Sequence, residues 1–129
     1  MKKTATFSTD VAAVCVEDGI LYAQLLQAEP SVEAFRAHIA KVRAHFGDIF
    51  PIRLVMYSTP DSKGVSKELR EFLSSDEMMT FVNAVAVITD SLLVRMAANL
   101  FFKISRPRYP MQLFTDEAKA VEWLRSLSL

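Results

Sequence analysis

The sequence predicts a single α/β domain with a mixed sheet, in which an N-terminal antiparallel hairpin precedes parallel strand–helix units with four main helices. Short apolar runs rich in β-branched residues alternate with stretches whose apolar residues recur at helical spacing. Such alternation, with short loops, implies parallel strands joined by right-handed crossovers. The length of 129 residues suits one domain over residues 1–129, because chains divide into several domains only beyond roughly 250 residues.

The hairpin and the first helix are predicted from the N-terminal third of the chain. Two apolar runs, residues 11–16 and 20–26, flank an acidic pair and Gly19, and glycine can take the positive φ of a tight turn. Ser31 can then cap a helix that Gly47 ends. The apolar residues of this helix recur four, three and four positions apart: Phe35, Ile39, Val42 and Phe46.

Two buried strands are predicted in the middle of the chain. Residues 51–57 are almost continuously apolar, as in a central strand covered on both faces, and residues 84–89 form a similar run. Between them, a polar loop at residues 59–64 leads to a second helix. We expect Ser62 and Lys63 to lie in an exposed loop or in the first helical turn, at the carboxyl edge of the sheet near Asp90 and Ser91. Ser74 and Glu77 then have capping-box spacing, which predicts a break and a short further helical turn.

The C-terminal part is predicted to add a long helix, a short strand and a last helix. Asp90 or Ser91 caps the long helix, which extends to about Ile104. Residues 111–114 form the strand. The acidic residues within 115–117 favour the N-terminus of the last helix.

Charge and cysteine content argue against several classes of protein. The 15 Lys and Arg residues balance the 15 Asp and Glu residues, so we expect no nucleic-acid partner, because such binders usually carry a basic face. The single cysteine, Cys15, lies in an apolar run and is expected to be a buried, unreactive thiol. The chain has no apolar stretch typical of a secretory leader or a membrane span, which predicts a cytoplasmic protein without a membrane partner.

A short polar segment and a C-terminal pattern resemble a known family. The segment is Asp61-Ser62-Lys63-Gly64, and the pattern lies within residues 83–127. Its matching residues are Asp90, Ser91, Arg95, Asn99, Phe101, Pro107, Pro110, Phe114, Ala120, Trp123 and Leu124. With the hairpin, they resemble a STAS domain of the SpoIIAA type, and most closely small bacterial STAS-like proteins. The resemblance implies this α/β fold and a regulatory role through protein contacts.

The resemblance implies less about mechanism than about fold. The prototypes are bacterial anti-anti-sigma factors, in which an Asp-Ser-Ser/Thr-Gly segment carries the residue that a partner kinase phosphorylates. In this chain Lys63 stands at the phosphoacceptor position, and Ser62 stands one position earlier. A phosphorylation switch at Ser62 is therefore an alternative, because function resides in sites and not in folds.

The candidate site lies at the carboxyl edge of the predicted sheet, where ligands of open parallel sheets bind. The candidate ligand- or partner-binding residues are Tyr57, Ser58, Asp61, Ser62, Lys63, Asp90, Ser91, Arg95 and Arg108. Helix N-termini attract anions, and Lys63, Arg95 or Arg108 can add charge, so a phosphate or carboxylate ligand is one interpretation. The other is that the serines and Asp90 only cap helices, while Arg95 pairs with Asp90 or faces solvent.

The sequence shows no pattern typical of an enzyme. Its three glycines form no phosphate-binding loop. His38 and His45 lie seven positions apart on the polar side of the first predicted helix, where we expect both in solvent and too distant to share a metal ion without other ligands. We therefore expect no catalytic residue, no cofactor and no metal.

The long predicted helix has more apolar surface than one sheet can cover. Its polar residues form one narrow stripe: Ser91, Arg95, Asn99 and Lys103. Nearly all other positions are apolar, whereas a helix on one sheet needs an apolar arc of about 100°. Either a neighbouring helix or a second subunit covers the excess, and we expect a homodimer through residues 92–104 and the adjoining loop to Pro110.

The leading functional hypothesis is a non-enzymatic STAS-like regulatory or protein-interaction module. The alternatives are the phosphorylation-dependent switch and a small-molecule or lipid-binding protein. Adaptable side chains that could line an apolar cavity support the latter: Met56, Met78, Met79, Phe81, Phe101 and Phe102.

Overall fold

A computed structural model describes residues 1, 3–62, 65–104 and 107–129. Within these residues the chain forms one six-stranded sheet with the spatial order β1-β2-β3-β4-β5-β6. The strands are β1 (Phe7–Ser8), β2 (Ala12–Glu17), β3 (Ile20–Leu25), β4 (Ile52–Tyr57), β5 (Val82–Ile88) and β6 (Met111–Phe114). Strands β1 to β3 pair antiparallel and β3 to β6 pair parallel, which confirms the predicted mixed sheet.

The hairpin between β2 and β3 closes through a two-residue turn. Glu17 pairs with Ile20, and the two residues between them, Asp18 and Gly19, have φ angles of 52° and 78°. Two positive φ angles in a two-residue loop match the twist of an antiparallel pair, and glycine adopts them without steric cost. The turn therefore sets the register that places Val14 and Leu21 in the core.

Five helices lie in the described part of the chain. They are α1 (Val32–Phe46), α2 (Lys67–Leu73), α3 (Asp76–Met79), α4 (Leu92–Ile104) and α5 (Glu117–Ser126). Ser31 caps α1 as predicted, and Asp116 caps α5. The predicted capping box at Ser74 is wrong, because the Ser74 hydroxyl donates back to Arg70 O and closes α2, while Ser75 caps α3.

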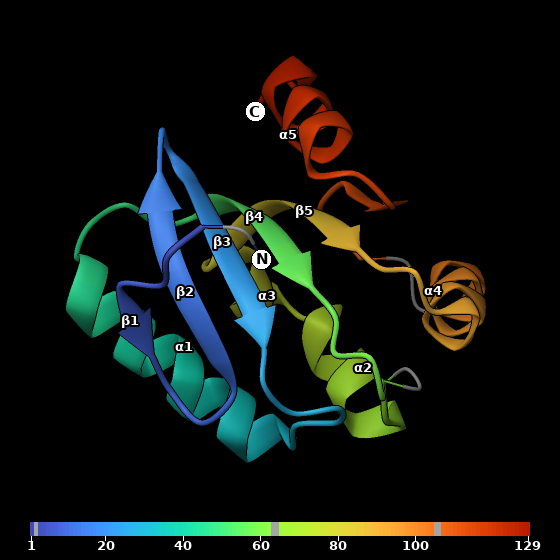
Figure 1. Ribbon diagram of the computed structural model, residues 1–129. Coiled ribbons are helices and arrows are strands. Elements are labelled where there is room, and N and C mark those ends of the chain that lie inside the picture. The colour runs from blue at the N-terminus through green and yellow to red at the C-terminus, as the bar shows by residue number, and fades with distance from the viewer. Residues whose placement is uncertain (2, 63–64, 105–106) are drawn as a thin grey trace.

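The helices lie on both faces of the sheet (Figure 1). Right-handed crossovers between successive neighbouring strands place their helices on one face, so α1, α2 and α3 share a side. Helix α5 follows the last strand and packs on the opposite face, against β4, β5 and β6. Helix α4 connects β5 to β6 at the side of the molecule, beyond the other helices (Figure 1).

Each face of the sheet has its own apolar core. Under α1 and α2 the core includes Val42, Leu54 and Phe72. Under α5 it includes Val55 and Leu124, together with Cys15, whose thiol is buried as predicted. Burial raises the pKa of this thiol, which favours its protonated form. Across the described residues, we find no helix with both the length and the apolar character needed to span a bilayer.

Candidate functional site

The carboxyl ends of β3, β4 and β5 surround a hollow of about 420 Å³, which we call the polar hollow. Its lining residues are Gln24, Tyr57, Ser58, Thr59, Pro60, Ile88, Thr89, Asp90 and Ser91. The parallel register explains the gathering, since Gln24 pairs with Tyr57 and Tyr57 pairs with Ile88 at one level of the sheet. Four predicted site residues, Tyr57, Ser58, Asp90 and Ser91, meet here.

Hydrogen bonds fix the polar side chains of the hollow. The Ser58 hydroxyl donates to Thr89 Oγ1 at 2.9 Å, and that same oxygen accepts from the Ser91 amide at 3.1 Å. The Gln24 side-chain amide donates to Ser58 O at 3.3 Å and so connects β3 to β4. The Tyr57 hydroxyl donates to the Glu117 carboxylate on α5. The hollow is therefore a preformed set of hydroxyl and amide groups.

Ser91 joins the hollow to the loop after β4. Its hydroxyl oxygen accepts from the Val94 amide at 3.2 Å, so Ser91 caps α4. The sequence predicts either Asp90 or Ser91 as this cap, and the structure shows that it is Ser91. The same hydroxyl donates to Ser62 O at 3.5 Å. The prediction that Ser62 lies near Asp90 and Ser91 is thus confirmed.

Ser62 is buried, and the expectation that it lies in an exposed loop is wrong. It is 7% exposed, and its hydroxyl donates to Ala28 O at 3.5 Å. The Ser62 amide bonds to Thr59 O at 3.1 Å, so a tight turn directs the residue inward. The neighbouring candidate, Lys63, lies outside the described residues.

The other charged candidates do not line the polar hollow. Asp61 and Arg95 are exposed and are absent from its wall. Arg108 precedes β6, so it lies toward the amino end of the parallel strands, where it pairs with Asp76. Among the described residues, the wall of the hollow therefore carries one ionisable acid, Asp90, and no Lys, Arg or His side chain.

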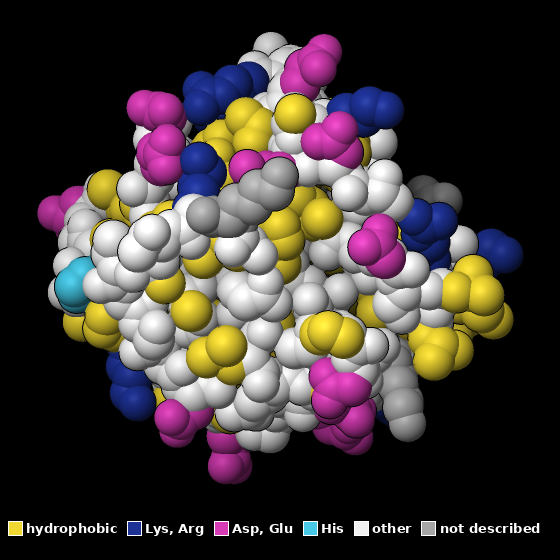
Figure 2. Space-filling view, in the orientation of Figure 1, with side chains coloured by type: hydrophobic (Ala, Val, Ile, Leu, Met, Phe, Trp, Pro, Cys, Tyr) yellow, Lys and Arg dark blue, Asp and Glu magenta, His cyan; other side chains and the backbone are white. Residues whose placement is uncertain are grey.

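Helix α4 exposes a row of large apolar side chains on the side away from the sheet. This row, the outer face of α4, consists of Leu92, Leu93, Met96, Leu100 and Ile104, each between 51% and 69% exposed. Hydrophobic side chains gather at the right of Figure 2, where Figure 1 draws α4, with Lys and Arg side chains beside them. No neighbouring helix in the described chain covers the outer face.

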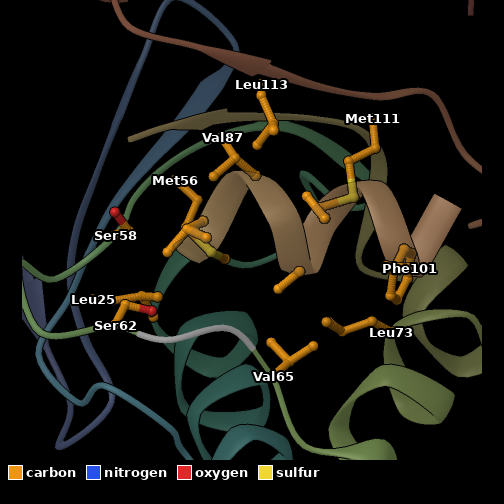
Figure 3. A pocket seen from close by; sticks show the side chains of 13 residues that line it. Leu25, Met56, Ser58, Ser62, Val65, Leu73, Val87, Phe101, Met111 and Leu113 are labelled. Atoms are coloured by element: carbon orange, nitrogen blue, oxygen red, sulfur yellow. The ribbon is translucent and has the colours of Figure 1, made fainter. Parts of the chain in front are cut away.

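The opposite side of α4 borders a partly open apolar cavity of about 110 Å³ against the sheet (Figure 3). Its lining residues are Leu25, Met56, Ser58, Ser62, Val65, Leu73, Val87, Val94, Ala97, Ala98, Phe101, Met111 and Leu113. The four α4 residues in this wall recur at helical spacing and form the inner face of α4. Of the thirteen α4 residues, all of them described, Phe101 is the one that is fully buried.

Three polar residues of the polar hollow, Gln24, Thr59 and Thr89, are missing from the sequence-based set of candidates. All three follow from the topology, because β3, β4 and β5 run parallel and their carboxyl ends reach the same edge. A prediction that treats β3 only as part of the antiparallel hairpin does not place Gln24 at this edge. Hydrophobic alternation alone does not reveal it, since pairing partners are set by the whole sheet.

His38 departs from its predicted solvent-exposed position. It is 5% exposed, and its Nδ1 shares a 2.6 Å hydrogen bond with Thr9 Oγ1. Burial, with a smaller effect from Lys41, lowers the pKa of His38 to about 4. His45 is exposed and stacks on Phe7. Within the described ranges, no three His, Cys, Asp or Glu side chains are placed to hold a metal ion.

Comparison with known protein families gives a match over most of the chain. A family described as a domain of unknown function (DUF7793) matches residues 14–128. The matched range includes most of β2, all of β3 to β6 and the five described helices. Neither the curated proteins nor the solved structures include a significant match.

Proposed function

The chain belongs to the family described as Domain of unknown function (DUF7793), and we propose that it is a non-enzymatic, STAS-like protein-interaction module. We propose that it acts through the outer face of α4, which binds a second copy of the chain. The observation that carries the proposal is the set of five large, half-exposed or more exposed apolar side chains on one helix face. Contiguous apolar patches on soluble domains are typical of interaction sites.

Burial energy favours covering this face. Removing a Leu, Ile or Met side chain from water is worth about 1.5–3 kcal/mol when burial is complete. The outer face offers five such side chains, each with at least half of its surface in solvent. Partial burial of all five supplies enough free energy to support a specific association after the cost of immobilising two molecules.

The charges around the helix favour a second copy as the partner. Helix α4 has 13 residues and is therefore about 20 Å long. If two copies pair antiparallel about a two-fold axis, Asp90 at one end lies near Lys103 of the other copy, and both side chains are exposed. Two such opposite-charge pairs flank an apolar centre. One helix pair is small beside a standard interface, so we expect micromolar affinity.

The polar hollow supports binding rather than catalysis. Its hydroxyls at Ser58 and Thr89 bond to each other, and the described wall contains no histidine or lysine to activate them. A nucleophilic hydroxyl normally needs such a base within hydrogen-bond reach. The buried, unreactive Cys15 suits a reducing compartment such as the bacterial cytoplasm, where we place the protein.

A phosphorylation switch at Ser62 is less well supported than self-association. A kinase needs an accessible hydroxyl, whereas that of Ser62 is buried. Phosphorylation would therefore require the loop after β4 to open. The apolar cavity supports a second function, the binding of a small ligand, which does not depend on the outer face.

Sedimentation velocity of the full chain across the micromolar range tests the proposed interaction. We expect a reversible monomer–dimer equilibrium in the wild type. Met96→Glu places a charge in the centre of the outer face and is expected to weaken dimerisation by at least about tenfold. Met79→Glu, at a 40% exposed position on α3, is the matched control and should leave the equilibrium unchanged. A wild type that stays monomeric, or equal effects of the two variants, would contradict the proposal.

A further inference from the structure

The apolar cavity and the polar hollow share a wall at Ser58. Ser58 lines both spaces, the first between α4 and the sheet and the second at the carboxyl edge of β3 to β5. One space is walled almost entirely by carbon, and the other by hydroxyl, amide and carboxylate groups. Adjoining apolar and polar compartments match a molecule with an apolar tail and a polar head. We infer that the two spaces together bind a single-chain amphiphile with an uncharged, hydroxyl-bearing head.

The apolar cavity, which would hold the tail, is a partly open space between α4 and the sheet. Figure 3 shows Met56, Val87 and Leu113 on one side of it and Val65 and Leu73 on another, with Phe101 at the end away from Ser58. Its volume of about 110 Å³ far exceeds the space for one water molecule. Empty apolar cavities of about 150 Å³ bind benzene, so an apolar space of this size can hold part of an acyl chain.

Helix α4 can adjust the size of this compartment. Phe101 is its one fully buried side chain, whereas the inner face presents the small residues Ala97 and Ala98 to the cavity. A small outward shift of α4 would lengthen the space and would loosen the packing of Phe101. This allows a chain longer than the cavity of the unliganded protein to enter.

The polar hollow, which would hold the head of the molecule, determines which amphiphile fits. Its described polar side chains are Gln24, Tyr57, Ser58, Thr59, Thr89, Asp90 and Ser91. Asp90 repels a carboxylate or phosphate, and no basic side chain in the described wall offsets it. Thr59 Oγ1 is buried in this wall without a hydrogen-bond partner among the described residues, and a hydroxylated head offers one when that side chain rotates. The chemistry thus favours a glycerol-like head over an anionic one.

The test uses the full chain with isotope-labelled methionine methyl groups and two probes with the same acyl chain, monodecanoylglycerol and decanoate, below their micelle concentrations. Met56 and Met111 line the cavity, while Met79 on α3 is an exposed control. We expect monodecanoylglycerol to shift the Met56 and Met111 methyl resonances and to leave Met79 unchanged. We expect decanoate to bind at least about tenfold more weakly.

Two alanine variants link binding to the cavity. Ala97→Leu fills it and should weaken binding of monodecanoylglycerol by at least about tenfold. Ala118→Leu adds the same side chain at an exposed position on α5, across the sheet, and should bind as the wild type does. Ala98→Leu replaces Ala97→Leu if circular dichroism shows that the latter is unfolded.

Three results would overturn the inference. They are the absence of Met56 and Met111 shifts, equal affinity for decanoate, and unchanged affinity in the cavity-filling variant. A response confined to Met96 also contradicts it, because it places the probe on the outer face of α4. A failure of this inference can be told apart from a failure of self-association, because sedimentation measures self-association without any probe.

Discussion

At the scale of single residues, the main departure from sequence expectation is the burial of polar side chains. His38 is a buried residue of α1, and the Thr9 hydroxyl oxygen that contacts it also accepts from the Val11 and Ala12 amides. That hydroxyl is therefore the donor to His38 Nδ1, which requires a neutral imidazole. A helical pattern does not reveal this pairing, because Thr9 lies 29 residues earlier.

The pH dependence of stability tests the His38 arrangement. Its pKa is lowered from 6.5 to about 4, so between these values the unfolded chain binds a proton that the folded chain does not. Stability therefore rises with pH and falls as pH drops through this window, by about 2 kcal/mol between about pH 7.5 and about pH 5. Urea denaturation at both pH values measures the loss.

His38→Gln should lack this part of the pH dependence, while His45→Gln, at an exposed position, should retain the wild-type behaviour. Carboxylates that titrate in the same range contribute equally to all three proteins and cancel in the comparison. The same loss of stability in His38→Gln as in the wild type would show that His38 is not held neutral.

At the scale of elements, sequence patterns predict the long, periodic segments best. The helix from Ser31 to Gly47 and the strand at residues 111–114 have the expected bounds, because caps and hydrophobic periodicity act locally. Strand β1 was not predicted, since two residues carry no periodicity and pair only because β2 offers a free edge. The sequence does not identify Ser75 as the cap of α3, because Ser74 and Ser75 are adjacent and either side chain is suited to cap a helix.

Helix α4 is the element whose sequence and packing disagree most. Its apolar surface predicts two covered faces, yet the described chain covers one, and that one encloses a cavity. Helix α5 is shorter but fully buries Ala120 and Leu124. Helix stability in proteins comes mainly from such packing, so α4 is expected to open more readily than α5.

Phe101→Ala is expected to release α4 from the sheet. Truncating a buried Phe costs about 3–5 kcal/mol, and here it removes the one fully buried side chain of the helix. Hydrogen exchange followed by mass spectrometry should show faster exchange over residues 92–104, with α5 unchanged. Phe102→Ala, next in the chain but only half-buried, should have a smaller effect. Equal protection of α4 in Phe101→Ala and wild type would contradict this account of its anchoring.

At the scale of the whole molecule, the sequence predicts the architecture but only part of the site. Alternating strands and helices suffice to predict the parallel sheet and therefore the edge where Ser58 and Ser91 meet. They do not predict that Arg108 lies at the other edge or that Ser62 turns inward, because loop paths depend on tertiary contacts. The expected anion site consequently lacks its arginines.

The two faces of α4 define the whole-molecule account. The inner face borders the apolar cavity, which we propose holds an apolar chain, and the outer face exposes large apolar side chains, which we propose bind a second copy. Because both faces belong to one helix, a ligand that shifts α4 also moves the surface offered for dimerisation. Binding and association are therefore expected to be coupled, and by linkage the coupling is reciprocal.

The central claim, that the outer face of α4 is a self-association surface, is tested most directly by the methionine methyl spectrum of the unliganded protein during dilution through the micromolar range. Met96 lies within the outer face, and Met79 is exposed elsewhere. We predict that the Met96 methyl resonance moves with protein concentration in step with dimer formation, while Met79 keeps one position. A Met96 resonance that does not change with concentration, or a shift of equal size at Met79, would contradict the claim.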